Sequence, residues 1–242
     1  MRSVCKYSTL LLIFLFPLTS AFSQKVQIQI VSPRELKGRK AILLTREKGF
    51  AALVHSIKLN SDVFNLEIDR DLVPDLYQLH VSQIKGSLLF FLEPGIKITL
   101  DTTDLSHSKV VNSKSTQEWK QFEQDIQQPS DRRMEQYAAG EKRARKTKNA
   151  DSLNYWVDKQ SFEKEDLVRQ SGEFIAENLD SYVSLYLLKI NWYAFQGKGI
   201  FEQLNSRMAG HKTYTFLKER NKKLAKAETT EPQHLKAANK VK

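Results

Sequence analysis

Cysteine is almost absent from this sequence. Of the 242 residues one is a cysteine, Cys5, and it falls within residues 1–23, which have the layout of a secretory signal peptide. Removal of that segment would leave a mature chain without a thiol. Such a chain forms no disulfide, supplies no thiolate nucleophile and binds no metal through sulfur. Its stability outside the cytoplasm must therefore come from packing.

Long hydrophobic runs are also missing. The apolar run at residues 10–18 is interrupted by a proline and is too short to span a bilayer. It follows a positively charged start, and the small residues Ala21 and Ser23 stand three and one positions before a cleavage site ahead of Gln24. A membrane anchor is the alternative, and the shortness of the run argues against it. The sequence therefore predicts export, cleavage before Gln24 and no stable membrane span afterwards.

The signatures of common catalytic and cofactor sites do not occur. The chain has no HExxH helix, GxSxG elbow, P-loop or GxGxxG turn. Its histidines are too far apart in the sequence to form a recognisable metal-ligand motif, and packed or surface roles are favoured over a metal site. They are His55, His80, His107, His211 and His234. No catalytic residue, no cofactor and no metal is predicted.

Basic residues are in excess. Lysine and arginine total 38 against 28 acidic residues, and removing Arg2 and Lys6 with the signal leaves 36 against 28, a net charge of +8. Much of the excess lies in "EKRARKTK" at residues 141–148 and in residues 218–242. Such runs can bind nucleic acid or an anionic membrane surface. Because an exported protein seldom meets nucleic acid, a solvated helix face and a loose tail are the favoured interpretation.

Residues 24–112 are predicted to form a β-domain. Four stretches alternate between apolar and polar residues, which is typical of antiparallel sheets with one buried face. Their apolar faces are Val26, Ile28 and Ile30; Phe64, Leu66 and Ile68; Tyr77, Leu79 and Val81; and Ile96, Ile98 and Leu100. "AILLT" and "SLLFFL" are apolar on both faces and predict central strands. With turn residues between them, these stretches predict an antiparallel β-sandwich of about seven strands.

Residues 113–227 are predicted to be helical, which makes the fold α+β. "STQE" at residues 115–118 fits a capping box. Trp119, Phe122 and Ile126 then share one helical face, and we expect them to contact the β-domain. Pro129 and Ser130 are expected to break this helix and start another.

One long amphipathic helix is predicted over residues 151–178. The next stretch follows Asp180 and Ser181, which are good N-cap residues, and is apolar nearly all round, so it predicts a buried helix. Two short helices follow the glycines at 197 and 199. Residues 228–242 are polar and basic without periodicity, and we expect a disordered tail.

An aromatic cluster, Trp192, Tyr193 and Phe195, follows the buried helix. It is the one candidate for a ligand or partner contact, because aromatic side chains often line sugar and peptide sites. Packing at the helix end is the alternative, and it is favoured because aromatic residues dominate protein cores. The carboxylates within residues 163–166 lie among opposite charges and are more typical of surface ion pairs than of an acid and base.

Three stretches together resemble a known family. "VQIQIV", "VFNLEI" and "LYQLHV…LLFFLEPGIKITLD" resemble an N-terminal domain of unknown function that is common in Bacteroidota envelope proteins. "FIAENLDSYVSLYLL" at residues 174–188 is similar to the helix entry of that family, with Leu179 where proline is usual. Residues 200–224 look like the helical pair that comes next. The resemblance covers about residues 25–225.

In the fuller members of that family a thioredoxin-like domain follows, and its CxxC pair exchanges disulfides. No CxxC occurs here, so those cysteines have no counterpart. The resemblance implies a non-catalytic module in the periplasm or outer envelope of a Gram-negative bacterium, which binds or positions a partner such as a separate thioredoxin-like protein. The alternatives are an accessory subunit that completes such an oxidoreductase, or a protein that binds a peptide or glycan.

Overall fold

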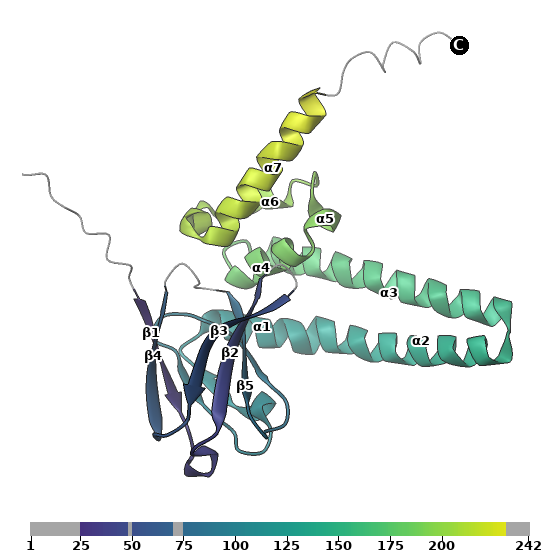
Figure 1. The fold of residues 1–242 in the computed structure, drawn as a ribbon. Helices are drawn as coiled ribbons and strands as arrows, with labels where there is room; N and C mark the ends of the chain where they lie inside the picture. Colours follow the sequence, from purple (N-terminus) through teal and green to yellow (C-terminus); the bar gives the residue numbers. More distant parts are fainter. Residues whose placement is uncertain (1–24, 48–49, 70–74, 231–242) are drawn as a thin grey trace, which may run out of the picture.

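The computed structural model describes residues 25–47, 50–69 and 75–230, and the predicted signal peptide and residues 231–242 lie outside these ranges. Two β-sheets form the N-terminal part of this region and helices form the rest, so the fold is α+β as predicted (Figure 1). Within the described ranges, no helix is both long enough and apolar enough to cross a membrane.

The first sheet has the strand order β4-β1-β7-β8. It contains β1 (Lys25–Val31), β4 (Val63–Asp69), β7 (Lys97–Thr99) and β8 (Lys109–Val111). Strand β1 pairs antiparallel with β4 and parallel with β7. The alternating residues predicted to face inward on these strands do so, because their apolar side chains leave water on one side of each strand.

The second sheet has the order β3-β2-β5-β6 and is antiparallel throughout. It contains β2 (Lys40–Glu47), β3 (Phe50–Lys58), β5 (Leu76–Val81) and β6 (Leu88–Phe91). Inward side chains of both sheets form one hydrophobic cluster, so the sheets share a single core.

Over the residues that the structure describes, the prediction of about seven antiparallel strands is therefore corrected to eight strands in two four-stranded sheets, with one parallel pair. The parallel pair arises at the turn through Pro94 and Gly95, where Gly95 adopts a φ of 75°. The chain leaves β6 of the second sheet there and enters the first sheet alongside β1. Strand β8 has three residues, which is too short for its alternation to be recognised.

Strand β6 belongs to two cores. "SLLFFL" predicts a central strand, but β6 lies at the edge of its sheet. Its residues Leu88 and Phe90 face the core between the sheets, whereas Phe91 lies in a second core formed mainly by helices. Both faces are apolar because helices cover the outer one. The prediction for "AILLT" is confirmed, since β2 lies between β3 and β5.

Helix α1 (Lys114–Phe122) begins two residues earlier than the predicted capping box. Its N-cap is Ser113, whose side chain accepts a hydrogen bond from the backbone N–H of Thr116. Ser115 instead donates its hydroxyl to Glu93, 2.8 Å away in the turn after β6. The predicted helical face is confirmed, because Trp119 and Phe122 are buried in the helical core and Ile126 packs against it.

The predicted break at Pro129 does not occur. A π-helical turn (Glu123–Gln127) joins α1 directly to α2 (Gln128–Thr147), and the flanking residues keep right-handed helical backbone angles. Proline cannot donate a backbone hydrogen bond, but Pro129 stands in the first turn of α2, where a helix tolerates the missing donor. The helix therefore continues through the proline without a break.

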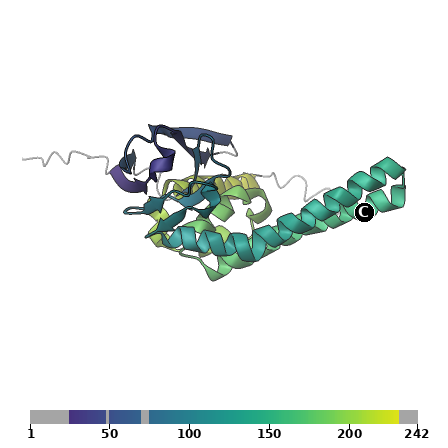
Figure 2. The same cartoon turned by 90° about the horizontal axis from the view of Figure 1, so that it is seen from below.

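Helices α2 and α3 (Ala150–Glu177) form a long hairpin that projects from the body (Figures 1 and 2). The turn places Lys148 at a φ of 53°, and the side chain of Asn149 caps α3 by accepting from Ser152 N. The 28 residues of α3 correspond to about 42 Å of helix. The predicted long helix is confirmed, and we call the hairpin the arm.

The remaining helices pack against one another and against α1 and α3. They are α4 (Tyr182–Ile190), α5 (Trp192–Phe195), α6 (Ile200–Gln203) and α7 (Lys212–Thr230). The prediction that the first of these is buried and capped by Ser181 is confirmed. Helix α7 leaves the body at a steep angle and continues to Thr230, so residues 228–230 are helical rather than part of a disordered tail.

Candidate functional site

The structure divides the predicted aromatic cluster in two. Trp192 and Phe195 are 2% and 5% exposed and belong to the helical core, as helix-end packing predicts. Phe195 packs against Gly172 of α3, where a Cβ atom would stand 3.2 Å from its ring. Tyr193 is instead 78% exposed. One of the three predicted residues therefore lies fully on the surface, beside the buried ring of Trp192.

Arg220 of α7 completes this site. Its guanidinium lies 5.3 Å from the ring centre of Trp192, 5.1 Å from Tyr193 and 5.5 Å from Phe216. These distances are within the range of cation–π attraction. Sequence analysis missed Arg220, and the available signal was the spacing of Phe216, Arg220 and Leu224, which places all three on one face of α7.

A surface hollow of about 380 Å³ lies between α5 and α7. It is lined by Trp192, Tyr193, Gln196, Arg220, Lys223 and Leu224. The lining therefore combines two aromatic rings and a leucine with two cations and one amide. Among the residues described, neither Arg220 nor Lys223 forms an ion pair with a carboxylate. We call this the α5–α7 hollow.

The carboxylates within residues 163–166 serve the arm. Glu163, whose side chain is 4% exposed, accepts two hydrogen bonds of 2.8 Å from Arg133 of α2. This pairing holds the pKa of Glu163 below its usual value. The expectation of a surface partner is thus wrong for Glu163, because its partner lies across the hairpin. It is right for Asp166, which pairs with the exposed Arg169 on the same helix.

A cluster of polar side chains around Glu93 fastens α1 to the β-domain. Glu93 accepts hydrogen bonds from the hydroxyls of Ser113 and Ser115, and Thr116 Oγ1 accepts from Phe91 N at 3.0 Å. The "FLEPG" stretch therefore holds the first turn of α1 in place. Each of these groups bonds to a neighbour in the fold, which indicates a structural role.

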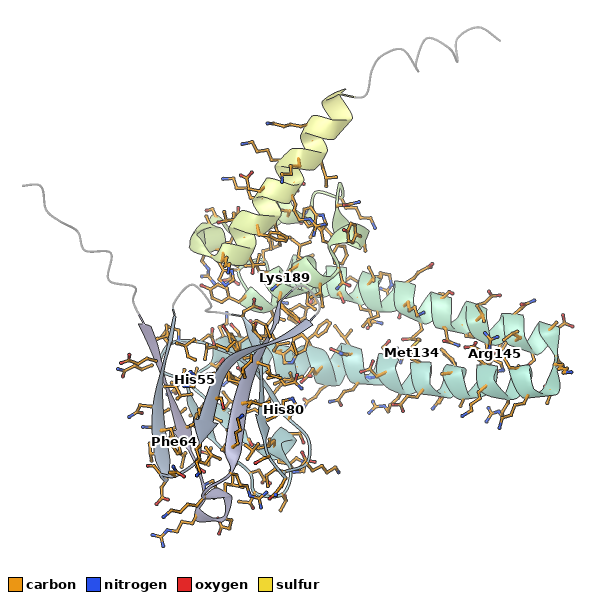
Figure 3. All side chains as sticks on the ribbon, in the orientation of Figure 1. His55, Phe64, His80, Met134, Arg145 and Lys189 are labelled. Carbon is orange, nitrogen blue, oxygen red and sulfur yellow. The ribbon has the colours of Figure 1, made fainter. Side chains whose placement is uncertain are left out.

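The histidines that the structure describes do not come together in a metal site. His55 lies on β3 and His80 on β5 (Figure 3), and in the part of the chain that the structure describes no group of three or more histidine, cysteine or acidic side chains could hold a metal ion. His234 lies outside the described residues. The basic run at residues 141–148 ends α2 at the tip of the arm, where Arg145 pairs with Glu141 (Figure 3).

Comparison with known proteins found no matching family model, no matching curated protein and no matching solved structure.

Proposed function

We propose that this protein is a non-catalytic, exported module of the cell envelope that binds a partner protein through its helical half. One observation carries the proposal: among the phenylalanine, tyrosine and tryptophan residues whose side-chain burial the structure describes, which leaves out Phe50, every exposed one lies on a helix. These are Tyr155, Phe162, Tyr193 and Phe216. Exposed aromatic rings beside arginine are typical of the residues that dominate binding energy at protein interfaces.

The β-domain acts as the support in this proposal. Its two facing sheets are interpreted as a β-sandwich of the kind found in the accessory region of envelope thiol-disulfide proteins. Glu93 and Phe91 hold α1, and Asp75 accepts from Lys189 of α4 at 2.9 Å, where α4 meets the second sheet (Figure 3). These contacts fix α1 and α4, and α4 in turn contacts α3, α5 and α7, which present the exposed rings.

A site-specific crosslinking experiment tests the proposal. A photoreactive phenylalanine analogue replaces Tyr193 or Phe162 in the host cell, and Val63 of the β-domain serves as the exposed control. We expect a discrete crosslinked envelope protein from at least one helical position and not from Val63. Crosslinking from Val63 with none from either helical position would contradict the proposal.

Export is tested separately. Intact-mass analysis of the envelope fraction should give a chain that begins at Gln24, because small residues at positions 21 and 23 precede that bond. A product that retains Met1 would refute the predicted cleavage.

The accessory-subunit alternative concerns the identity of the partner. Disulfide exchange needs a thiolate that attacks a sulfur atom, and a mature chain without cysteine would depend on the cysteines of its partner. Identification of the crosslinked protein as one with a CxxC pair would favour this alternative. The peptide- or glycan-binding alternative is favoured by the α5–α7 hollow, which lies beside Trp192 and Tyr193.

A further inference from the structure

Arg220 lies among aromatic rings and also lines the hollow. Its guanidinium lies against three rings, those of Trp192, Tyr193 and Phe216. Aromatic rings engage a guanidinium through its flat faces, whereas its N–H donors point outward in the plane. A planar carboxylate is the acceptor that matches two such donors in parallel. Because Arg220 lines the hollow, a carboxylate that enters the hollow can accept hydrogen bonds from its N–H donors.

The charge around this group is uncompensated. Helix α7 carries six lysine and arginine residues and two glutamates. Lys223 lines the same hollow as Arg220, and neither forms an ion pair among the residues that the structure describes. A neutral sugar would leave both charges uncompensated, whereas a ligand with two carboxylates would neutralise them.

The rest of the hollow is apolar. Tyr193 forms one side with most of its ring exposed, and Leu224 lies on the same face of α7 as Arg220. An apolar side chain next to the carboxylates of a ligand would cover these surfaces. The volume of about 380 Å³ fits a few side chains rather than a folded element.

We infer that the α5–α7 hollow recognises an acidic peptide segment of the partner. The segment places carboxylates on Arg220 and Lys223 and an adjoining apolar side chain against Tyr193 and Leu224. This inference rests on the proposed function and specifies the chemistry of the partner.

Fluorescence anisotropy with defined probes tests the inference. The protein purified from the envelope is titrated into a labelled seven-residue peptide with three glutamates and two leucines. The matched probe has glutamine in place of each glutamate. We expect the glutamate peptide to bind at least about tenfold more tightly, because hydrogen bonds to charged groups add this much affinity. Equal binding of the two peptides would overturn the inference.

Variants then locate the binding. Arg220→Gln should weaken the glutamate peptide about tenfold or more, and Arg220→Lys should fall between this variant and the wild type because lysine keeps the charge but lacks the planar fork. Tyr193→Ala should weaken it about fivefold through the lost apolar contact. Circular dichroism confirms that each variant is folded.

Lys218→Gln is the matched control. Lys218 lies on α7 two residues before Arg220, so it faces a different side of the helix and does not line the hollow. Its loss removes the same charge and should change the affinity by less than about twofold, as for an exposed charge outside the site. An effect as large as that of Arg220→Gln would overturn the inference, because it would mean general attraction to a basic helix.

A membrane surface is distinguished by a third probe. Vesicles of neutral lipid with one-third anionic lipid should bind the wild type and Arg220→Gln equally. Vesicle binding that depends on Arg220, without binding of the glutamate peptide, would overturn the inference. If crosslinking from Tyr193 succeeds while the peptide fails, the acidic chemistry alone is wrong. If neither crosslinking from Tyr193 nor binding of the glutamate peptide is observed, the hollow has no role in the proposed partner binding.

Discussion

Individual side chains in the helical half differ sharply in what they contribute to stability. Phe122 is buried, stacks on Trp119 with a centroid distance of 5.6 Å and meets Phe174 edge-on at 5.3 Å. Phe162 on the arm is 66% exposed. The two phenylalanines therefore offer a matched pair for testing the core.

Phe122→Ala should lower the free energy of unfolding by about 3 kcal/mol or more, because it removes a buried ring and leaves a cavity. Urea unfolding followed by circular dichroism measures the change. Phe162→Ala is the control and should cost less than about 0.5 kcal/mol. Equal losses in the two variants would show that Phe122 is not buried.

The ion pair between Glu163 and Arg133 gives the arm a pH-dependent stability. The pKa of Glu163 is lowered in the folded protein by its hydrogen bonds to Arg133. A carboxylate with a lowered folded pKa stabilises the protein above its unfolded value, about 4.3, and this stability is lost as the pH falls through the folded value.

At pH 7 the wild type should exceed Glu163→Gln in free energy of unfolding by about 1.5 kcal/mol, the range for hydrogen bonds to a charged group. The difference should shrink steadily below about pH 4. Urea midpoints measured at pH 7, 4 and 3 follow it. The control is Asp166→Asn, whose partner Arg169 is largely exposed, so its effect should be small at every pH. If the difference in free energy of unfolding between the wild type and Glu163→Gln grew toward pH 3, the assigned ion pair with Arg133 would be contradicted.

At the residue level, the sequence indicates the rings but not their partner. Trp192, Tyr193 and Phe195 stand out as three aromatics within four residues, whereas Arg220 is one of many basic residues in a basic segment. Which rings it approaches depends on how α7 packs beside α5, and no local pattern determines that. The same packing explains why Tyr193 is exposed while Trp192 and Phe195 are buried.

At the scale of elements, the arm depends on a close approach of its two helices. Gly140 of α2 lies against Trp156 of α3, so a Cβ atom at position 140 would overlap the indole ring. Trp156 is also held by Tyr137 and Tyr155. The absence of a side chain at position 140 therefore decides how near the helices come.

Gly140→Ala tests this packing, because two effects oppose each other. Alanine favours a helix over glycine by about 1 kcal/mol. The overlap with a ring held by two neighbours should cost about 1–3 kcal/mol, so we expect a net loss of stability and faster amide exchange in the arm. In a Trp156→Leu background the same substitution should be neutral or stabilising. A gain of stability in the wild-type background would contradict the close packing.

The sequence predicts the elements whose apolar residues repeat with a regular spacing. It does not predict the elements whose position depends on contacts with distant segments. Strands β1, β4, β5 and β7 follow their alternation because each has one face on the core between the sheets. The sequence does not reveal that β6 is an edge strand, because its second apolar face meets helices rather than another strand layer. The pairing of α2 with α3 was not predicted, since α2 packs through small residues such as Gly140 and Ala144 and lacks an apolar stripe.

At the scale of the whole molecule, the β-domain and the helices share a core. Leu76 and Phe91 come from the second sheet, yet both are buried among helical residues. Phe91 meets Tyr186 edge-on at 6.0 Å and lies 6.2 Å from Trp119. The expected apolar junction between the two halves is confirmed, and Leu76, Leu89 and Phe91 are the residues that the β-domain contributes to it.

This shared core predicts that the two halves unfold together. All three tryptophans, Trp119, Trp156 and Trp192, lie in the helical half, so their fluorescence reports on the helices, while the amide signals of β1 report on the first sheet. Both probes should give the same urea midpoint, because exposing Phe91 would cost each half part of its core. Phe91→Ala should shift both midpoints together and lower the free energy of unfolding by about 3 kcal/mol. Leu53→Ala, at an exposed position of β3, should shift neither. Separate midpoints in the wild type, or a Phe91→Ala effect confined to one probe, would mean that the halves are held together less tightly than this shared core requires.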